Sequence, residues 1–242
     1  MRIPRIYTPQ ALTANSIITL EEQASHHLIK VLRLSTSHPI TLFNGKGGSY
    51  SAHIETPHKK AAAIRVLEFT DSNLDSPLAT HIAIGLSKGD KLELIIQKAT
   101  ELGVHSISPI TSKHSDVKMN QERADKKLRQ WQQIAISACE QSGRNTVPTI
   151  HPVQSYAQWV SNINPSDTVA LFHTRDGKKL SELEQPNNLH LCFGPEGGFS
   201  EAEVAALTST HHQVLTLGRR ILRAETAPIA CLGAVQVMWG DW

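Results

Sequence analysis

The 242-residue sequence has 40% hydrophobic and 19% charged residues, with 14 glycines and 12 prolines. These proportions exclude collagen-like, low-complexity and intrinsically disordered classes and are typical of a folded globular protein of one or two domains. The formal net charge of +2 provides no strong overall attraction to nucleic acid. The charge is uneven, however, because residues 1–72 carry eight Lys/Arg against five Asp/Glu and residues 73–242 carry sixteen against seventeen. The first segment therefore has a weak preference for anions.

The three cysteines, Cys139, Cys192 and Cys231, are too few and too widely spaced for a disulfide framework or a zinc ribbon. We therefore expect reduced thiols and a cytoplasmic protein. No apolar segment follows the charged N-terminus, and the longest apolar stretch, residues 227–239, is interrupted by proline, glycine and glutamine. The sequence predicts neither secretion nor a membrane span.

The first 70 residues alternate short apolar runs with turn signals, a pattern typical of the strands of a small β-barrel or sandwich. The predicted strands are residues 17–20, 40–43, 50–54 and 61–69. A short helix interrupts them, and Ser25 is expected to cap its N-terminus. Polar, aperiodic residues at 71–77 predict a linker. The sequence thus predicts two domains, residues 1–72 and residues 73–242.

The hydrophobic period changes after the linker. Residues 81–86 and 104–110 are apolar runs, and between them Asp90 is expected to cap a helix that ends at Gly103. A strand, a helix and a second strand in this order predict a parallel sheet with helices on its faces. Further predicted helices are residues 121–141, 156–163, 201–208 and 226–238, and further predicted strands are residues 168–172, 189–193 and 213–217. The second domain is therefore expected to be α/β.

The residues that follow the predicted strands are informative, because open parallel sheets bind ligands at the carboxyl ends of their strands. The strand at 189–193 leads into Gly194-Pro195-Glu196-Gly197-Gly198, and the capping-box pattern Ser200-Glu201-Ala202-Glu203 follows. Three glycines in five residues leave backbone N–H and C=O groups open to a ligand. A tight turn between strand and helix explains the same glycines without a ligand.

Three arginines, Arg219, Arg220 and Arg223, follow the strand at 213–217 and precede a predicted helix. A helix N-terminus attracts anions, so clustered cations at this position indicate a negatively charged ligand. The alternative is that Glu225 is their structural partner. The cations of the helix at 121–141 are interpreted as an ordinary solvated face.

Several common motifs are absent from the sequence. It contains no GxGxxG dinucleotide fingerprint, no GxxxxGK[ST] phosphate loop and no HExxH zinc motif. The run Gly45-Lys46-Gly47-Gly48 is more consistent with a hairpin turn. The histidines include two adjacent pairs, which do not point in one direction on a helix or strand, and no metal site is predicted.

Four motifs occur in order along the chain: Lys98-Ala99-Thr100-Glu101-Leu102-Gly103-Val104, Glu140-Gln141-Ser142-Gly143-Arg144, Gly194-Pro195-Glu196-Gly197-Gly198-Phe199 and Leu217-Gly218-Arg219-Arg220-Ile221-Leu222-Arg223-Ala224-Glu225-Thr226-Ala227. Together they resemble the RsmE family of bacterial 16S ribosomal RNA uridine N3-methyltransferases. The first domain is similar to the PUA-like RNA-binding domain of that family through Arg5-Ile6-Tyr7, His27 with Val31-Leu32-Arg33, and Phe43-Asn44-Gly45. The resemblance spans nearly the whole chain.

The resemblance implies a SPOUT-type α/β fold, in which a parallel sheet ends in a C-terminal trefoil knot and is preceded by a small PUA-like β-barrel domain. It also implies S-adenosylmethionine as the cofactor, a homodimer, and 16S rRNA within the 30S subunit as the partner. The cofactor is expected to contact the loops that follow three of the strands. These residues are Leu171, Phe172, His173, Gly194, Pro195, Glu196, Gly197, Gly198, Leu217, Gly218, Ile221, Leu222 and Arg223.

Methylation at uridine N3 requires loss of the N3 proton, and negative charge then develops on the uracil oxygens. Arg144 and Arg223 are candidates to stabilise this charge. Glu196 and Glu225 are candidates for the general base. Each has a structural alternative, because a cation after a helix is stabilising by itself and either glutamate can pair with an arginine or cap a helix.

Six residues of the first domain are candidates for RNA contact: Arg2, Arg5, His27, Lys30, Arg33 and Asn44. Cations among them are expected to bind phosphate and position the RNA without reading its sequence, and ordinary surface charge is the alternative. The target uridine is expected to be single-stranded or turned out of its stack.

Two other functions stay open on the sequence alone. One is a non-catalytic RNA-binding protein whose second domain serves only for dimerisation. The other is a SPOUT enzyme that methylates the 2′-hydroxyl of ribose. Binding of S-adenosylmethionine distinguishes an enzyme from a non-catalytic RNA-binding protein. Identification of the modified nucleoside distinguishes methylation at uridine N3 from methylation of the ribose.

Overall fold

The computed structural model describes residues 3–72, 74–87, 89–115, 117, 119–174, 177–208 and 212–242. The chain forms two compact units. Unit 1 contains residues 1–75 together with residues 136–147, and unit 2 contains residues 76–135 and 148–242. The sequence predicts a boundary near residue 72, but it gives no sign that a later segment returns to the first unit.

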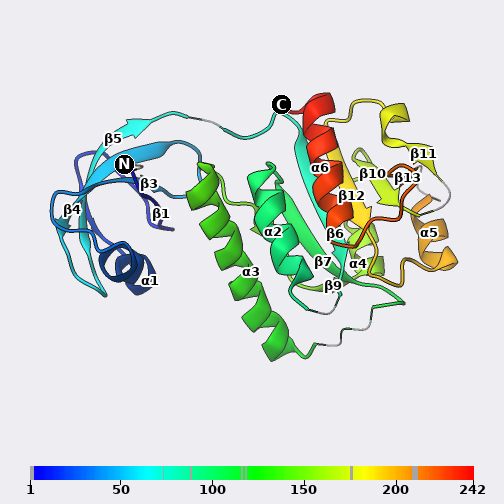
Figure 1. Cartoon of the computed structure of the whole chain (residues 1–242), viewed down its shortest axis with the longest axis horizontal. Helices are drawn as coiled ribbons and strands as arrows, with labels where there is room; N and C mark the ends of the chain where they lie inside the picture. The colour runs from blue at the N-terminus through cyan, green and yellow to red at the C-terminus, as the bar shows by residue number, and fades with distance from the viewer. Residues whose placement is uncertain are drawn as a thin grey trace. The chain divides into compact units, whose positions relative to one another are not determined.

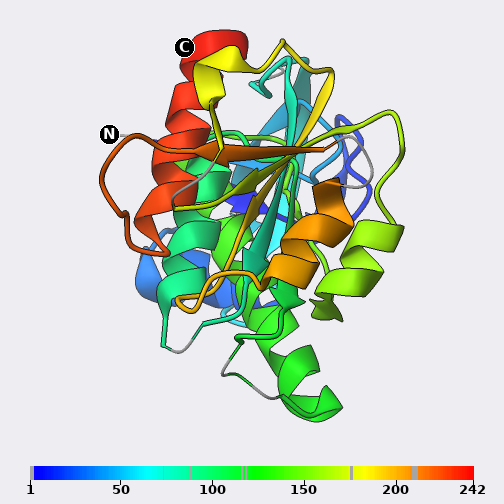
Figure 2. The same cartoon turned by 90° about the vertical axis from the view of Figure 1, so that its right-hand side faces the viewer.

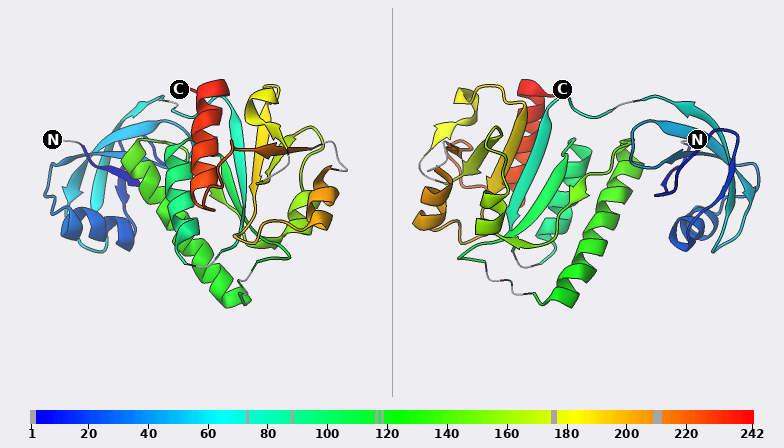
Figure 3. Two further views of the ribbon diagram at one scale, coloured as in Figure 1. Left: turned by 45° about the vertical axis from the view of Figure 1, so that its right-hand side comes forward. Right: turned by 180° about the vertical axis from the view of Figure 1, so that it is seen from behind.

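Unit 1 is built on a five-stranded sheet, which is curled (Figures 1 and 3). Its strands are β1 (Arg5–Tyr7), β2 (Ile17–Thr19), β3 (Pro39–Phe43), β4 (Ser49–Thr56) and β5 (Ala63–Thr70), in the hydrogen-bonded order β1-β3-β4-β5-β2. The β1–β3 pair is parallel and the other pairs are antiparallel. Ala52 and Ile54 lie two residues apart on β4 and are both buried, as alternation on a strand requires. They join the core with Leu42 and Ile64.

The helix of unit 1 begins before Ser25, so the prediction that Ser25 caps it is wrong. Helix α1 spans Glu22–His26 and continues as a π-helix, η1, over His27–Val31. Ser25 is buried within α1, where its hydroxyl donates to the Leu20 carbonyl (3.1 Å) and accepts from the Ala62 N–H (2.9 Å). Its side chain therefore fastens the helix to the start of β5. π-Helical turns are rare and are often found at functional sites.

Unit 2 is built on a parallel sheet, as predicted. The strand order is β11-β13-β10-β12-β6-β7-β8, and β9 pairs with β7. The main strands are β6 (Ala79–Gly85), β7 (Ser106–Thr111), β10 (Thr168–Phe172), β12 (Asn188–Phe193) and β13 (Gln213–Thr216), and the two-residue strands are β8 (Thr149–Ile150), β9 (Gln154–Ser155) and β11 (Lys178–Lys179). Every pairing in this sheet is parallel. The trefoil knot implied by the resemblance stays a prediction.

Helices cover both faces of this sheet. They are α2 (Lys91–Glu101), α3 (Gln121–Ser142), α4 (Tyr156–Ser161), α5 (Glu201–Thr208) and α6 (Thr226–Trp239), with a short 3-10 turn, η2 (Leu180–Glu182). Figure 2 shows α2 and α6 on one face and α4 and α5 on the other. In α2 the predicted apolar stripe is buried, including Leu92, Ile95 and Ile96. Asp90 occupies the N-cap position of α2 but makes no side-chain cap hydrogen bond.

Helix α3 has 22 residues but a strongly charged sequence, whereas the apolar α6 has only 14 residues. Among the described residues, no helix therefore has the combination of length and apolarity that a bilayer span requires. Pro228 is the third residue of α6, within the first turn, where a missing N–H costs no helical hydrogen bond.

Candidate active site

A cavity of about 310 Å³ lies at the carboxyl ends of β10, β12 and β13. Its lining comes from three segments: residues 172–174 at the end of β10, residues 193–199 at the end of β12, and residues 217–227, which run from the end of β13 into α6. Figure 3 shows the third segment running from β13 to the start of α6. The cavity thus occupies the sheet edge at which parallel α/β folds bind ligands.

Twelve of the thirteen predicted cofactor residues line this cavity. The exception is Leu171, which is fully buried in the core with Val169 and Cys192. The lining also contains six residues that were not among the predicted cofactor contacts: Thr174, Phe193, Phe199, Arg220, Ala224 and Ala227. Phe193 is the last residue of β12, so the rule that ligands bind at the carboxyl ends of parallel strands also points to it.

The glycine-rich segment turns sharply as it leaves β12. The Gly198 N–H donates to the Pro195 carbonyl (2.8 Å), and Gly198 has a φ of +68°, which glycine adopts without steric strain. A Cβ at Gly85, the last residue of β6, would collide with Pro195. The segment therefore packs on the sheet edge by its backbone. The role of Gly85 could not be predicted from the sequence, because Gly85 contacts Pro195, which is far along the chain.

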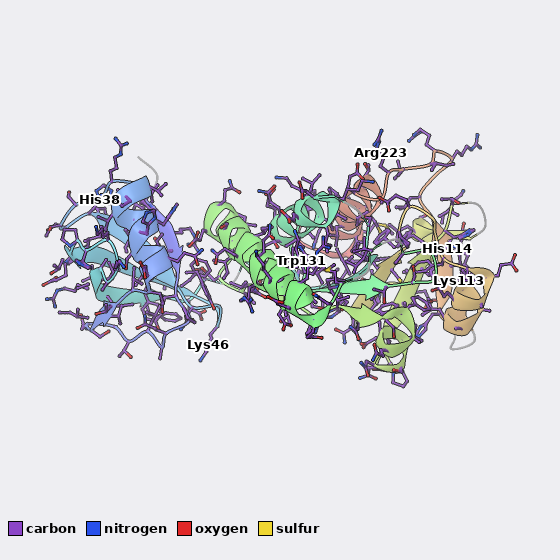
Figure 4. All side chains as sticks on the ribbon, turned by 90° about the horizontal axis from the view of Figure 1, so that it is seen from below. His38, Lys46, Lys113, His114, Trp131 and Arg223 are labelled. Atoms are coloured by element: carbon purple, nitrogen blue, oxygen red, sulfur yellow. The ribbon has the colours of Figure 1, made fainter. Side chains whose placement is uncertain are left out.

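The loop after β7 restrains the glycine-rich segment. His114 Nδ1 lies 3.1 Å from the Gly197 carbonyl oxygen, and a Cβ at Gly197 would lie only 2.9 Å from the His114 Cβ. The Lys113 N–H donates to Glu203 Oε1 at 2.8 Å. Figure 4 shows Lys113 and His114 next to each other on this loop. Neither residue stands out in the sequence, because no pattern links the loop to the glycines.

Ser200 and Glu203 form the predicted capping box at the start of α5. Glu203 Oε2 accepts from the Ser200 N–H and hydroxyl, both at 2.8 Å, and Ser200 Oγ accepts from the Glu203 N–H at 3.4 Å. Burial opposes ionisation of Glu203, but hydrogen bonds from the N–H groups of Ser200 and Lys113 outweigh it and lower the pKa of Glu203. The charged carboxylate therefore joins α5 to the loop after β7.

Two phenylalanines give the cavity a flat apolar wall. Phe172 and Phe193 are paired residues at the ends of neighbouring strands, and their rings stack with centroids 4.6 Å apart and an interplanar angle of 6°. Leu217, Ile221 and Leu222 add further apolar lining. Apolar walls beside open backbone groups are typical of sites for a ligand with a flat ring and polar edges.

Of the predicted catalytic residues, Arg223 and Glu196 line the cavity. Glu196 Oε1 accepts from Lys91 Nζ at 2.6 Å. Glu225 follows the lining residue Ala224, and among the described residues its buried Oε2 has no hydrogen-bond partner. Figure 4 shows Arg223 on the segment before α6.

Arg144 is not among the residues that line this cavity. Arg144 belongs to unit 1 and is only 4% exposed, and its guanidinium donates to Asp75 Oδ1 at 3.0 Å. The same segment is fastened by Glu140, which accepts from the Tyr7 N–H (3.0 Å) and whose pKa is raised by burial. The Asn145 amide donates to the backbone carbonyl of Ser72 at 2.7 Å. The motif at 140–144 thus attaches residues 136–147 to the rest of unit 1.

Among the predicted RNA contacts, the structure gathers His27, Lys30 and Arg33 on η1 and the turn after it. Lys30 and Arg33 are exposed, and Arg33 has a φ of +56°. Arg5 instead donates to Asn145 Oδ1 at 2.5 Å and lies over the Phe43 ring. The Asn44 side chain accepts from the Lys46 N–H, which closes a turn. Arg2 lies outside the described residues.

A second cavity lies at the opposite, amino-terminal edge of the sheet of unit 2 and contains several histidines. The His81 and His190 rings stack 4.6 Å apart, and His190 Nε2 lies 3.0 Å from Asp167 Oδ2. Burial and then the neighbouring His190 and His105 lower the pKa of His81 to about 4. In the part of the chain that the structure describes, no three His, Cys, Asp or Glu side chains are placed to hold a metal ion.

Two family models match the chain. Residues 74–236 match an RNA methyltransferase domain, and residues 20–67 match an RNA methyltransferase PUA domain. The chain is 35% identical to ribosomal RNA small subunit methyltransferase E from Bacillus subtilis, over 94% of this chain and 93% of the relative.

Two solved structures are similar over their full length. One is a ribosomal RNA small subunit methyltransferase E from Neisseria gonorrhoeae bound to S-adenosyl methionine, with 36% identity, a TM-score of 0.93 and complete coverage of both chains. The other is the methyltransferase Lpg2936 from Legionella pneumophila with bound S-adenosyl methionine, with 35% identity, a TM-score of 0.96 and the same coverage. With both units matched in sequence and in fold, the chain belongs to the ribosomal RNA small subunit methyltransferase E family.

Proposed function

We propose that this protein binds S-adenosylmethionine in the cavity at the carboxyl edge of the unit 2 sheet and methylates N3 of a uridine in 16S rRNA. The observation that carries the proposal is the position and lining of this cavity, in a chain that matches relatives solved with that cofactor over their full length. The protein is then a cytoplasmic enzyme that acts on the small ribosomal subunit.

The lining fits this cofactor. The stacked rings of Phe172 and Phe193 and the apolar Leu217 and Ile221 offer surface to an adenine ring. Backbone groups of the glycine-rich segment are open because a Cβ is absent there, and they suit the polar edges of the base and sugar. When bound, S-adenosylmethionine supplies a methyl group on a positively charged sulfur.

The residues of this chain have to orient uridine, remove the N3 proton and stabilise the uracil oxygens. Arg223 lines the cavity and is exposed, so its guanidinium is available to the developing negative charge. We assign proton removal to Glu225, because its buried Oε2 lacks a partner among the described residues. Glu196 is less suited, because it is already paired with Lys91 and is about half exposed.

Unit 1 is assigned to RNA binding. It matches the PUA domain model at residues 20–67, and this range includes the exposed Lys30 and Arg33. The left-handed backbone of Arg33 is unusual for a residue with a Cβ and is often found where function requires it. These cations would bind phosphate and position the RNA.

We further assign a homodimer to this protein. Helices α2 and α6 pack against each other. Leu94 of α2 and Val237 and Met238 of α6 are exposed apolar side chains, and Trp242, just after α6, is 66% exposed. Light scattering of the purified protein tests this assignment, and replacement of Val237 by Glu is expected to shift the mass toward that of one chain.

The function is tested by methyl transfer from radiolabelled S-adenosylmethionine to isolated 30S subunits and to naked 16S rRNA. The product is digested and its modified nucleoside is identified by mass spectrometry. The proposal expects 3-methyluridine, with faster transfer to 30S subunits. A 2′-O-methylated nucleoside contradicts the assigned reaction, and absence of saturable cofactor binding favours a non-catalytic RNA-binding protein.

A further inference from the structure

Five cations lie on two adjoining segments of unit 2. Lys178 and Lys179 form β11, and Arg219, Arg220 and Arg223 follow β13. The ranges 177–182 and 213–223 contain these five cations and a single carboxylate residue, Glu182. Since the whole chain has a formal net charge of only +2, positive charge is concentrated here.

The strand pairing brings the two segments together. β11 lies parallel to β13, with Lys178 opposite Leu215 and Lys179 opposite Thr216. Arg219 follows Thr216 by three residues, so its Cα is within about 15 Å of the Lys179 Cα at ordinary strand spacing and rise. Figure 1 shows β11 and β13 side by side.

These cations are exposed, and no ion pair involving them occurs among the described residues. Like charges held this close repel each other, and no carboxylate among the described residues lies within ion-pair distance of them. A surface of this kind is stabilised when an anionic partner covers it.

The cluster also adjoins the cavity. Arg220 and Arg223 are part of the cavity lining, and Ile221 between them is 80% exposed. A partner that covers this surface therefore meets cations along two chain segments and an apolar side chain next to them. A nucleic acid strand offers both, through its phosphates and its base faces, whereas a small anion would contact only one or two of the cations.

We propose that Lys178, Lys179, Arg219 and Arg220 form a cationic rim that binds phosphates of the RNA strand next to the target uridine. This inference rests on the proposed function, because it takes the substrate RNA as the partner. The rim belongs to unit 2 and is separate from the RNA-contact residues assigned to unit 1. It would hold the strand at the cavity without reading its sequence.

The rim is tested with the triple variant Lys178→Gln, Lys179→Gln and Arg219→Gln in the full chain. Arg220 stays unchanged because it lines the cavity. The dissociation constant for 16S rRNA is measured from 50 to 300 mM KCl, and its logarithm is plotted against the logarithm of the salt concentration. Each phosphate contact contributes about 0.7 to 0.9 to this slope, so the variant is expected to lower the slope by about two to three.

The matched control is Arg123→Gln, Lys126→Gln and Arg129→Gln, which removes the same charge from the exposed face of α3. It is expected to change the slope by less than about half a unit. The conservative variant with Lys178→Arg, Lys179→Arg and Arg219→Lys is expected to keep the wild-type slope. Affinity for S-adenosylmethionine, which reports folding of unit 2, should stay within about twofold of wild type in all three.

A wild-type slope in the triple Gln variant, or an equal loss in the α3 control, overturns the rim. Methyl transfer by the wild-type protein tests the proposed function separately. If wild type methylates 16S rRNA and the slopes of wild type and variant agree, only the rim is wrong. If wild type transfers no methyl group but the slopes differ as expected, the rim stands as an RNA-binding surface and the proposed reaction is wrong.

Discussion

His114 and Gly197 restrain each other at one contact. The His114 Nδ1 lies 3.1 Å from the Gly197 carbonyl oxygen, while the His114 Cβ occupies the space that a side chain at position 197 would need. The glycine-rich wall of the cavity is thus held by a residue from a different loop. The conformation of this wall depends on the loop after β7 as well as on its own sequence.

We expect Gly197→Ala to weaken S-adenosylmethionine binding at least about tenfold, which corresponds to about 1.4 kcal/mol. The added Cβ comes too close to the His114 Cβ, so the loop moves away from His114. The hydrogen bond between His114 Nδ1 and the Gly197 carbonyl is then lost. Isothermal titration calorimetry measures the affinity. Adding His114→Gly to Gly197→Ala removes the opposing Cβ and should restore part of the affinity. A double variant that binds no better than Gly197→Ala shows that this contact is not the cause.

Gly233→Ala is the control, because its Cβ would lie 3.8 Å from the nearest atom.

Arg144 is expected to act on stability rather than on catalysis. Arg144→Met removes the guanidinium from Asp75 inside unit 1, and breaking a buried ion pair costs about 3 kcal/mol of unfolding free energy. Urea denaturation measures this loss. The exposed Arg223 is the comparison, since Arg223→Met should change stability by less than about 0.5 kcal/mol while lowering kcat. Full stability with lost turnover in Arg144→Met would instead assign Arg144 to catalysis.

The two glutamates near the cavity are expected to differ in kinetics. Glu225→Gln removes the assigned proton acceptor, and general-base catalysis is typically worth about 10² to 10⁴ in rate. We expect a loss of kcat in that range together with loss of the acidic limb of the pH–rate profile. Glu196→Gln, which weakens the pair with Lys91, should retain the limb. Single-turnover methyl transfer at several pH values distinguishes them, and the reverse pattern would make Glu196 the base.

Acid is expected to destabilise unit 2 through His81. Its pKa is about 4 in the folded protein, because burial and the neighbouring His190 and His105 oppose a positive charge, and about 6.5 in the unfolded chain. The unfolded state therefore binds the proton first, so stability is complete above pH 6.5 and falls as the pH drops toward 4. Between pH 7 and pH 5 this amounts to at most about 2 kcal/mol.

Urea denaturation at pH 7 and pH 5 checks this effect. His81→Asn should reduce the difference in unfolding free energy between the two pH values. His58→Asn, at an exposed position of unit 1, serves as the control and should keep the wild-type difference. If His81→Asn leaves the pH dependence unchanged, His81 is not the group that titrates.

The features that could be predicted from sequence depend on neighbours along the chain. The stripe of Leu92, Ile95 and Ile96 predicts α2, and the capping pattern of Ser200 and Glu203 predicts the start of α5, because both signals lie within a few residues. The location of the cavity follows from the rule that strand tails meet at one sheet edge.

The features that could not be predicted depend on contacts between distant residues. Ser25 is of a residue type that often caps helices, but it lies within α1, and its hydroxyl accepts from the Ala62 N–H, 37 residues later in the chain. The pairing of Arg144 with Asp75, 69 residues earlier in the chain, is not indicated by the motif that contains Arg144. His114 gains importance only when the fold brings it to Gly197. The two-residue strand β11 is too short to give a periodic signal.

The return of residues 136–147 to unit 1 affects the order in which a nascent chain can fold. After residue 75 leaves the ribosomal exit tunnel, 60 more residues must follow before residue 136 leaves it, which takes about 3 to 12 seconds at ordinary rates of protein synthesis. During this interval the hydrogen bond from Tyr7 to Glu140 and the ion pair between Asp75 and Arg144 cannot form. The N-terminal sheet must therefore stay soluble while incomplete, and its last contacts form only after most of α3 has been synthesised.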